Sequence, residues 1–265
     1  MQRLTLPLRL LTLIVILQLA ACATSPTGRK QLKLFPENQM AQMGIASYVQ
    51  MKEQTPLSKD KFTNSYVNCV ADAITRETGS SYQWEVNVFN DEAINAFALP
   101  GGKIGVYTGI LQVASTQDQL AAVIGHEVAH VLANHGNERV SVAFAADSGL
   151  KMAQILAGAP TQQKAQLLGL LGLGAQVGVL LPYGRTQESE ADILGLEYMA
   201  KAGFDPRQSV TLWQNMAKVG GKKPPELLST HPSNATRIKE LNSRMEPAMK
   251  LYKQARANNK KPNCR

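Results

Sequence analysis

The sequence has few of the residues that usually build metal and disulfide sites: it contains four histidines and three cysteines in 265 residues. It also lacks internal repeats, and its glycines do not form a dinucleotide-binding fingerprint, which argues against a repeat architecture and a dinucleotide site. The Leu/Gly-rich run at residues 167–174 is too short and too often interrupted by glycine to span a membrane. Because the histidines and cysteines are so few, each can be considered individually.

Two of the histidines stand with a glutamate in the segment Gly125-His126-Glu127-Val128-Ala129-His130. Residues four apart on a helix differ by only about 40° around its axis, so the imidazoles of His126 and His130 can reach one metal ion. Glu127 is rotated by about 100° and lies beside the metal, where a general base can take a proton from a zinc-bound water. The segment therefore predicts the centre of a zinc metalloprotease.

The flanking residues favour a helix. Thr116 can cap its start, Gln119 completes a possible capping box with Ser115-Thr116, and apolar residues recur with helical spacing from Leu120 to Leu132. We therefore expect the two histidines on a core helix.

A third ligand has to come from elsewhere in the chain, because catalytic zinc usually takes three protein ligands. On a continuing helix His135 would point away from the metal, so we expect an exposed or helix-end residue there. The stretch from Arg185 to Gly195 predicts a second helix, on which Glu188 and Asp192 share a face. We assign Glu188 as the third ligand and Asp192 as the acceptor for the outer N–H of a ligand histidine, while Glu190 should face solvent or a salt bridge.

These motifs resemble the M48 metallopeptidases, which pair HExxH with a later E-x-x-A-D, here Glu188, Ala191 and Asp192. The segment from Asn95 to Gly109 resembles the part of that family that precedes the active-site helix, and His231-Pro232 with Arg237-Ile238 resembles its HP-x-x-x-x-R-I element. The resemblance covers roughly residues 60 to 245 and is closest to the bacterial lipoprotein and Oma1-like branch. It implies a zinc peptidase with one Zn²⁺ per chain.

The predicted fold class is α+β: a mainly helical, zincin-like domain with a small β-sheet beside the HExxH helix. Alternating residues at 84–89 and the β-prone run at 104–107 predict the sheet. An extended peptide could add to its edge as a strand. The family resemblance assigns Asn95, Ala96 and Phe97 to this substrate-binding region; a turn followed by core packing is the alternative.

Two residues of the last motif have open roles. His231 could donate to the oxyanion, occupy the open zinc position and hold the enzyme inactive, or serve only a structural purpose. Arg237 could anchor Asp192 or the carboxylate network, or be an ordinary surface arginine.

The N-terminus resembles a bacterial lipoprotein signal, in which Arg3 and Arg9 precede a short apolar core that closes in Leu19-Ala20-Ala21-Cys22. We expect lipidation of Cys22 after removal of residues 1–21, a tether at 22–36 and a peptidase domain at 37–265; an uncleaved anchor is the alternative. Ala23 after the cysteine resembles the outer-membrane sorting pattern, which predicts the periplasmic face of the outer membrane. A helix is expected after Pro36 to about residue 54 and another over roughly 58–77.

Cys69 and Cys264 remain after lipidation, and in an oxidising periplasm they could form a disulfide or stay as free thiols. A bond would stabilise the fold by at most roughly 5 kcal/mol on a chain-entropy estimate. The formal net charge of +8 falls to near +6 without Arg3 and Arg9, and much of the excess lies in the C-terminal tail. An exported lipoprotein rarely meets nucleic acid, so we expect no nucleic-acid partner and a solvated tail near anionic lipid.

The long insert at residues 141–181 separates the two ligand motifs and could pack as a buried helix, act as a lid, or present a surface to unfolded substrates. The sequence thus predicts a zinc endopeptidase that hydrolyses misfolded or misassembled envelope proteins. The alternative is a zinc-binding, chaperone-like lipoprotein in which hydrolysis is suppressed.

Overall fold

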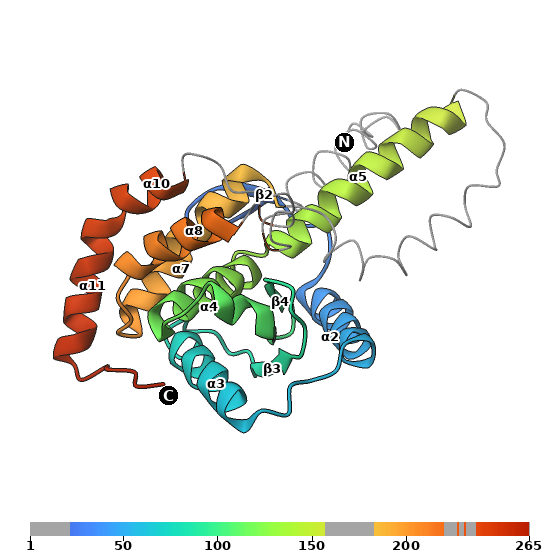
Figure 1. Ribbon diagram of the computed structural model, residues 1–265. Helices are drawn as coiled ribbons and strands as arrows, with labels where there is room; N and C mark the ends of the chain where they lie inside the picture. The colour runs from blue at the N-terminus through green and yellow to red at the C-terminus, as the bar shows by residue number, and fades with distance from the viewer. Residues whose placement is uncertain (1–21, 157–182, 220–226, 228–230, 232–236, 265) are drawn as a thin grey trace.

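The computed structural model describes residues 22–156, 183–219, 227, 231 and 237–264 (Figure 1). The predicted signal at 1–21, most of the insert, including its Leu/Gly run, and residues 232–236 of the last motif lie outside the described residues. Within these ranges the chain is mainly helical with two small sheets, which confirms the predicted α+β class. None of the helices in the described ranges has the length and apolarity needed to cross a membrane.

The larger sheet has three strands in the order β3-β5-β4, formed by β3 (Glu85–Phe89), β5 (Lys103–Tyr107) and β4 (Ala96–Leu99). β5 runs parallel to β3 and antiparallel to β4. The β4–β5 connection needs left-handed backbone at Gly101 (φ 87°) and Gly102 (φ 74°), which glycine adopts without a steric penalty. The strand order places β4 at an edge of this sheet.

The two faces of this sheet pack against different helices. One face joins the main core with α3 (Lys61–Thr75) and α4 (Gln117–Leu132). The other carries an aromatic cluster, completed by Tyr48 of α2 (Glu37–Gln54), whose hydroxyl donates to the carbonyl of Ile104 (2.7 Å). The cluster consists of Tyr48, Phe89, Phe97, Leu99 and Tyr107.

Helix α4 starts where the capping pattern predicted: the Thr116 hydroxyl accepts from the N–H of Gln119 (3.2 Å). It crosses α7 (Arg185–Lys201) with glycine on both sides of the contact. A Cβ on Gly195 would lie 2.8 Å from the backbone nitrogen of His126, and one on Gly125 would lie 2.9 Å from the carbonyl oxygen of Gly195. The two glycines let the helices approach closely enough for α7 side chains to reach the α4 histidines.

The N-terminal segment, where we expected a tether, contains a hairpin of β1 (Cys22–Thr24) and β2 (Lys30–Leu32). The chain after it is held to α5 (His135–Leu156), because Asn137 donates to the carbonyl of Phe35 (2.7 Å) and the N–H of Leu34 donates to the Ser141 hydroxyl (2.9 Å). Residues 22–36 are thus packed onto the domain through specific polar contacts.

The remaining helices surround α4 and α7. A short 3-10 helix, η1 (Thr108–Gln112), connects the sheet to α4, and α8 (Arg207–Val219) packs on α4. α10 (Arg237–Ser243) and α11 (Met245–Ala257) pack on α7. A disulfide joins Cys69 of α3 to Cys264, with 5.6 Å between their Cα atoms, so the C-terminal tail is fastened beside α3.

Candidate metal centre

Four buried side chains from three separate parts of the chain converge on one point. His126 and His130 come from α4, Glu188 from the first turn of α7, and His231 from the segment before α10. One ligand atom from each lies within 4.8 Å of all the others. The structure thus brings together the two histidines and the distant glutamate that the sequence predicted as ligands. It also places His231 among them, as one of the roles left open for that residue expected.

The spacing of these atoms fits a small tetrahedral metal ion. Nε2 of His130 lies 3.0 Å from Nε2 of His126 and 3.4 Å from Oε1 of Glu188, and Nδ1 of His231 lies 3.0 Å from the same oxygen. Ligands bound to zinc at about 2.0–2.1 Å in a tetrahedron are about 3.3 Å apart. Three imidazole nitrogens and one carboxylate oxygen are also donors that zinc prefers, so the residues present fit the zinc expected for this kind of site.

A second layer of charge holds these side chains. Asp192, one turn after Glu188, has Oδ1 at 2.9 Å from Nδ1 of His126. Arg237 donates from Nε to Asp192 (2.6 Å) and from Nη2 to Glu188 (2.5 Å), and its guanidinium lies 3.8 Å from the Trp213 ring centre. Of the roles that the sequence left open for Arg237, the geometry favours the anchoring one.

The carboxylates govern the protonation of this centre. Burial lowers the pKa of His126, but its hydrogen bonds with Asp192 and Glu188 outweigh burial and raise the pKa to about 10. Burial also opposes ionisation of Glu188, yet hydrogen bonds from His126, His130 and His231 hold the pKa of its carboxyl well below the ordinary value. Glu188 is therefore charged and ready to bind a cation.

Glu127 lies beside the cluster on α4, with its side chain almost completely buried. Its Oε1 atom is 3.5 Å from Nε2 of His231 and, among the described residues, has no hydrogen-bond partner. Burial raises the pKa of this carboxyl, with the charge of His231 acting in the opposite direction. A carboxylate with a free oxygen and a raised pKa suits a general base.

Our expectation for His135 is only partly right: it stands at a helix end, as the first residue of α5, but its side chain is fully buried, and its Nδ1 lies 2.9 Å from Nδ1 of His130. The expectation assumed one continuous helix, but α4 ends at Leu132 and Asn134 adopts a left-handed conformation (φ 57°) before α5 begins. The break turns His135 back towards His130. Asn tolerates positive φ better than most residues, so the Asn134-His135-Gly136 sequence was the signal for this helix end.

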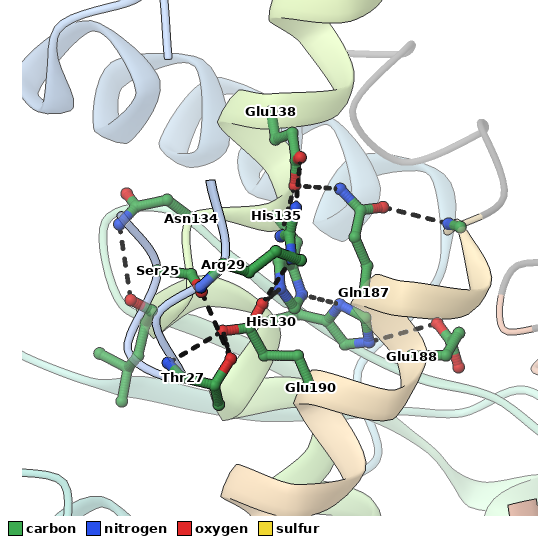
Figure 2. A network of polar contacts seen from close by, with 12 residues as sticks. Ser25, Thr27, Arg29, His130, Asn134, His135, Glu138, Gln187, Glu188 and Glu190 are labelled. Atoms are coloured by element: carbon green, nitrogen blue, oxygen red, sulfur yellow. Dashed lines mark hydrogen bonds and ion pairs between the residues drawn. The ribbon is translucent and has the colours of Figure 1, made fainter. Parts of the chain in front are cut away.

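Glu190, for which we allowed solvent or a salt bridge, is buried and ion-paired. Its Oε2 atom lies 3.2 Å from Nε2 of His135 and 3.0 Å from Nε of Arg29 in the N-terminal hairpin (Figure 2). Sequence reasoning missed Arg29, because nothing in the local pattern indicates a partner more than 100 residues away.

A further aromatic residue that the sequence did not indicate covers the centre. Tyr183, which precedes the N-cap residue Gly184 of α7, stacks on the His130 ring with 3.7 Å between ring centres, and the Arg139 guanidinium lies over the Tyr183 ring at 3.6 Å from its centre. Burial raises the pKa of Tyr183 to about 12, so its hydroxyl stays protonated at neutral pH.

The predicted substrate residues Asn95, Ala96 and Phe97 lie at the start of edge strand β4, and all three are buried. The Phe97 ring packs in the aromatic cluster, as the core-packing alternative expected, so any contact of this residue with a peptide would be through its backbone. A small cavity of about 40 Å³ lies between β4, α2 and His130, and its apolar lining includes Met40, Met43 and Leu99.

Comparisons with known proteins agree with this geometry. The model of "Peptidase family M48" matches residues 61–245. The mitochondrial metalloendopeptidase OMA1 of Schizosaccharomyces pombe is 39% identical over 182 residues, which cover 68% of this chain and 52% of that protein. The human mitochondrial metalloendopeptidase OMA1 is 35% identical over 179 residues, covering 65% of this chain and 34% of that protein.

A bacterial relative is also similar. The β-barrel assembly-enhancing protease of Escherichia coli K12 is 26% identical over 214 residues, which cover 78% of this chain and 44% of that protein. The chain thus spans about half or less of the length of these relatives. The family match covers most of the chain, and the chain belongs to peptidase family M48.

Proposed function

We propose that this member of peptidase family M48 is a zinc-dependent endopeptidase of the bacterial envelope, anchored by lipid on Cys22 at the periplasmic face of the outer membrane. Its substrates are misfolded or misassembled envelope proteins. The observation that carries the proposal is the convergence of His126, His130 and Glu188 on one point, with the free Glu127 oxygen beside it.

The residues around this point have distinct tasks. Bound zinc supplies a water molecule of lowered pKa and polarises the peptide carbonyl. Glu127 takes the proton from the attacking water and passes it to the departing amine, for which its raised pKa is suited. Asp192 and Arg237 keep His126 and Glu188 in place.

Substrate binding uses the edge of the sheet. An extended peptide that pairs with β4 gains backbone hydrogen bonds with little sequence preference, which suits unfolded substrates. A side chain of that peptide can enter the cavity beside His130, whose methionine and leucine lining favours apolar groups.

One observation favours the alternative function, a zinc-binding, chaperone-like protein in which hydrolysis is suppressed. His231 would supply a fourth protein donor to a metal held by His126, His130 and Glu188, at the position that a reacting water would otherwise take. In this state the protein could hold clients in the manner of a chaperone. With zinc bound, a reacting water would have to displace His231 or bind beside it as a fifth ligand.

The substitution Glu127→Gln tests the proposed activity. The near-isosteric amide leaves the three ligands intact, so zinc content should remain at one ion per chain, while hydrolysis of a fluorescently labelled unfolded protein falls by about 10²–10⁴-fold. A chelator should abolish the wild-type activity and added zinc restore it. Undiminished turnover by the Gln variant would exclude Glu127 as the base.

The anchor requires a separate test, since it concerns residues at the edge of the described structure. Cells supplied with labelled palmitate should label the wild-type protein but not Cys22→Ser, and the wild type should sediment with outer-membrane vesicles. Recovery of unlabelled wild-type protein in the soluble fraction would contradict the proposed anchor.

A further inference from the structure

A second polar network, in which His135 and Glu190 are buried, adjoins the metal centre at His130 (Figure 2). His130 stands between the two, with Nε2 directed at the other ligand atoms and Nδ1 directed at His135. His135 in turn directs Nε2 at Glu190 (3.2 Å). The three side chains form a continuous line from the metal position to Glu190.

The hydrogen positions along this line follow from metal binding. A neutral imidazole that binds a metal through Nε2 carries its proton on Nδ1, so Nδ1 of His130 is a donor. The two Nδ1 atoms of His130 and His135 face each other at 2.9 Å, and only one of them can carry a hydrogen. His135 therefore accepts at Nδ1, carries its proton on Nε2 and donates it to Glu190.

Glu190 is fixed by the N-terminal hairpin rather than by its own helix. The Thr27 hydroxyl donates to Oε1 of Glu190 (2.7 Å), and Nε of Arg29 donates to Oε2 (3.0 Å). The terminal nitrogens of Arg29 form a fork with Glu138 on α5 (2.6 and 2.7 Å), and Glu138 also accepts from Gln187 on α7 (2.7 Å). Arg29 thus connects the hairpin to α5 through Glu138 and to α7 through Glu190 (Figure 2).

The two ligand histidines are supported differently. His126 has Asp192 directly at its outer nitrogen (2.9 Å), whereas the first carboxylate behind His130 is reached through a second imidazole. Outer partners of this kind fix the tautomer and ring orientation of a ligand histidine, and losing one typically weakens metal binding by about 10–100-fold.

We propose that His135, Glu190 and Arg29 act as positioning residues for the zinc ligand His130, so that docking of the hairpin that begins at Cys22 determines how tightly the centre holds zinc. The proposal rests on the zinc site of the proposed function and adds a connection between that site and the segment next to the membrane anchor. None of the three residues contacts the reacting atoms. They act through His130.

Zinc affinity of the full-length protein in detergent, measured by competition with a chromogenic chelator, tests this proposal. His135→Leu removes the acceptor and should bind zinc about 10–100-fold more weakly. His135→Asn keeps an oxygen near the position of Nδ1 and should recover much of the loss. Arg29→Ala should also weaken binding. Lys30→Ala should match the wild type, because Lys30 is an exposed residue of the same hairpin whose side chain, among the described residues, bonds only to Thr24.

A spectroscopic readout separates positioning from general stability. In ¹⁵N-histidine spectra of the zinc-loaded wild type, Nδ1 of His130 and Nε2 of His135 should both carry protons that exchange slowly with water. The His130 proton should exchange rapidly in His135→Leu and stay protected in His135→Asn. If His135→Leu does not fold, Glu190→Gln and Arg29→Ala provide the same comparison.

The possible results separate a failure of the positioning role from a failure of the proposed zinc peptidase function. The positioning role would be overturned, and the zinc peptidase function left intact, if the His135→Leu and Arg29→Ala proteins folded and bound zinc with wild-type affinity. Equal losses in the Leu and Asn variants would refute the hydrogen-bond explanation. A wild-type protein that does not bind zinc would overturn both proposals.

Discussion

Removing the Arg237 guanidinium should destabilise the protein most strongly when zinc is absent. In Arg237→Met the buried carboxylates of Glu188 and Asp192 lose a partner that lies 2.5 and 2.6 Å away. Removing one member of a buried ion pair costs about 3–5 kcal/mol. At about 2–4 °C per kcal/mol for a chain of this size, the melting temperature should fall by about 6–20 °C.

Zinc changes this expectation in a defined direction. A bound cation neutralises part of the charge on Glu188, so the difference between wild type and Arg237→Met should shrink when both proteins are zinc-loaded. Arg237→Lys keeps the charge but not the two-pronged geometry, and it should fall between them. In the metal-free protein, the double variant Asp192→Asn/Arg237→Met should lose less stability than the sum of the losses of the two single variants, because Asp192→Asn removes one of the unpaired charges.

Thermal unfolding followed by circular dichroism, with and without zinc, provides the measurement. A fall of less than about 2 °C for metal-free Arg237→Met would refute the reasoning, because it would mean that water or another cation already satisfies the two carboxylates. A larger fall in the zinc-loaded protein than in the metal-free protein would refute the assignment of Glu188 to the metal.

Three further predictions concern other parts of the structure. His231→Ala should raise the rate of unfolded-protein hydrolysis at unchanged zinc content, since it vacates the fourth ligand position; a lower rate would instead assign His231 to the oxyanion. Gly195→Ala should lower the free energy of unfolding by about 1–3 kcal/mol and make the protein lose zinc more easily to a chelator, because the new Cβ would lie 2.8 Å from the backbone nitrogen of His126. Gly136→Ala is the control: the nearest atom to its Cβ would be 3.9 Å away, so neither effect is expected. Glu85, whose pKa is lowered to about 2 by hydrogen bonds with Lys103 and a second lysine, should stabilise the fold above about pH 4.3 and stop doing so as the pH falls towards 2. Because its side chain is 40% exposed, Glu85→Gln should lower the melting temperature at pH 7 by at most about 4 °C, and the difference should vanish at low pH.

Local pattern in the sequence was sufficient for the elements that carry the chemistry. The cap at Thr116 and the apolar repeat predicted α4, and the four-residue spacing placed His126 and His130 on one side of it. The same helical periodicity placed Glu188 and Asp192 on one face of α7. These predictions succeeded because they depend on helix geometry within a few turns. The match of both motifs to a known family added the pairing of the two helices.

Tertiary structure alone decided what surrounds those residues. The approach of α4 and α7 depends on Gly125 meeting Gly195, and neither glycine carries a local signal of its partner. His135 was misjudged because one left-handed residue, Asn134, ended the helix and redirected the chain.

The contact of Arg29 with Glu190 spans 161 residues, a separation at which periodicity and spacing carry no information. By contrast, the spacing of residues within the sequence was enough to determine which side chains can bind the metal and perform the proposed chemistry. The folded chain determined which groups support them, because partners distant in sequence are selected only by packing.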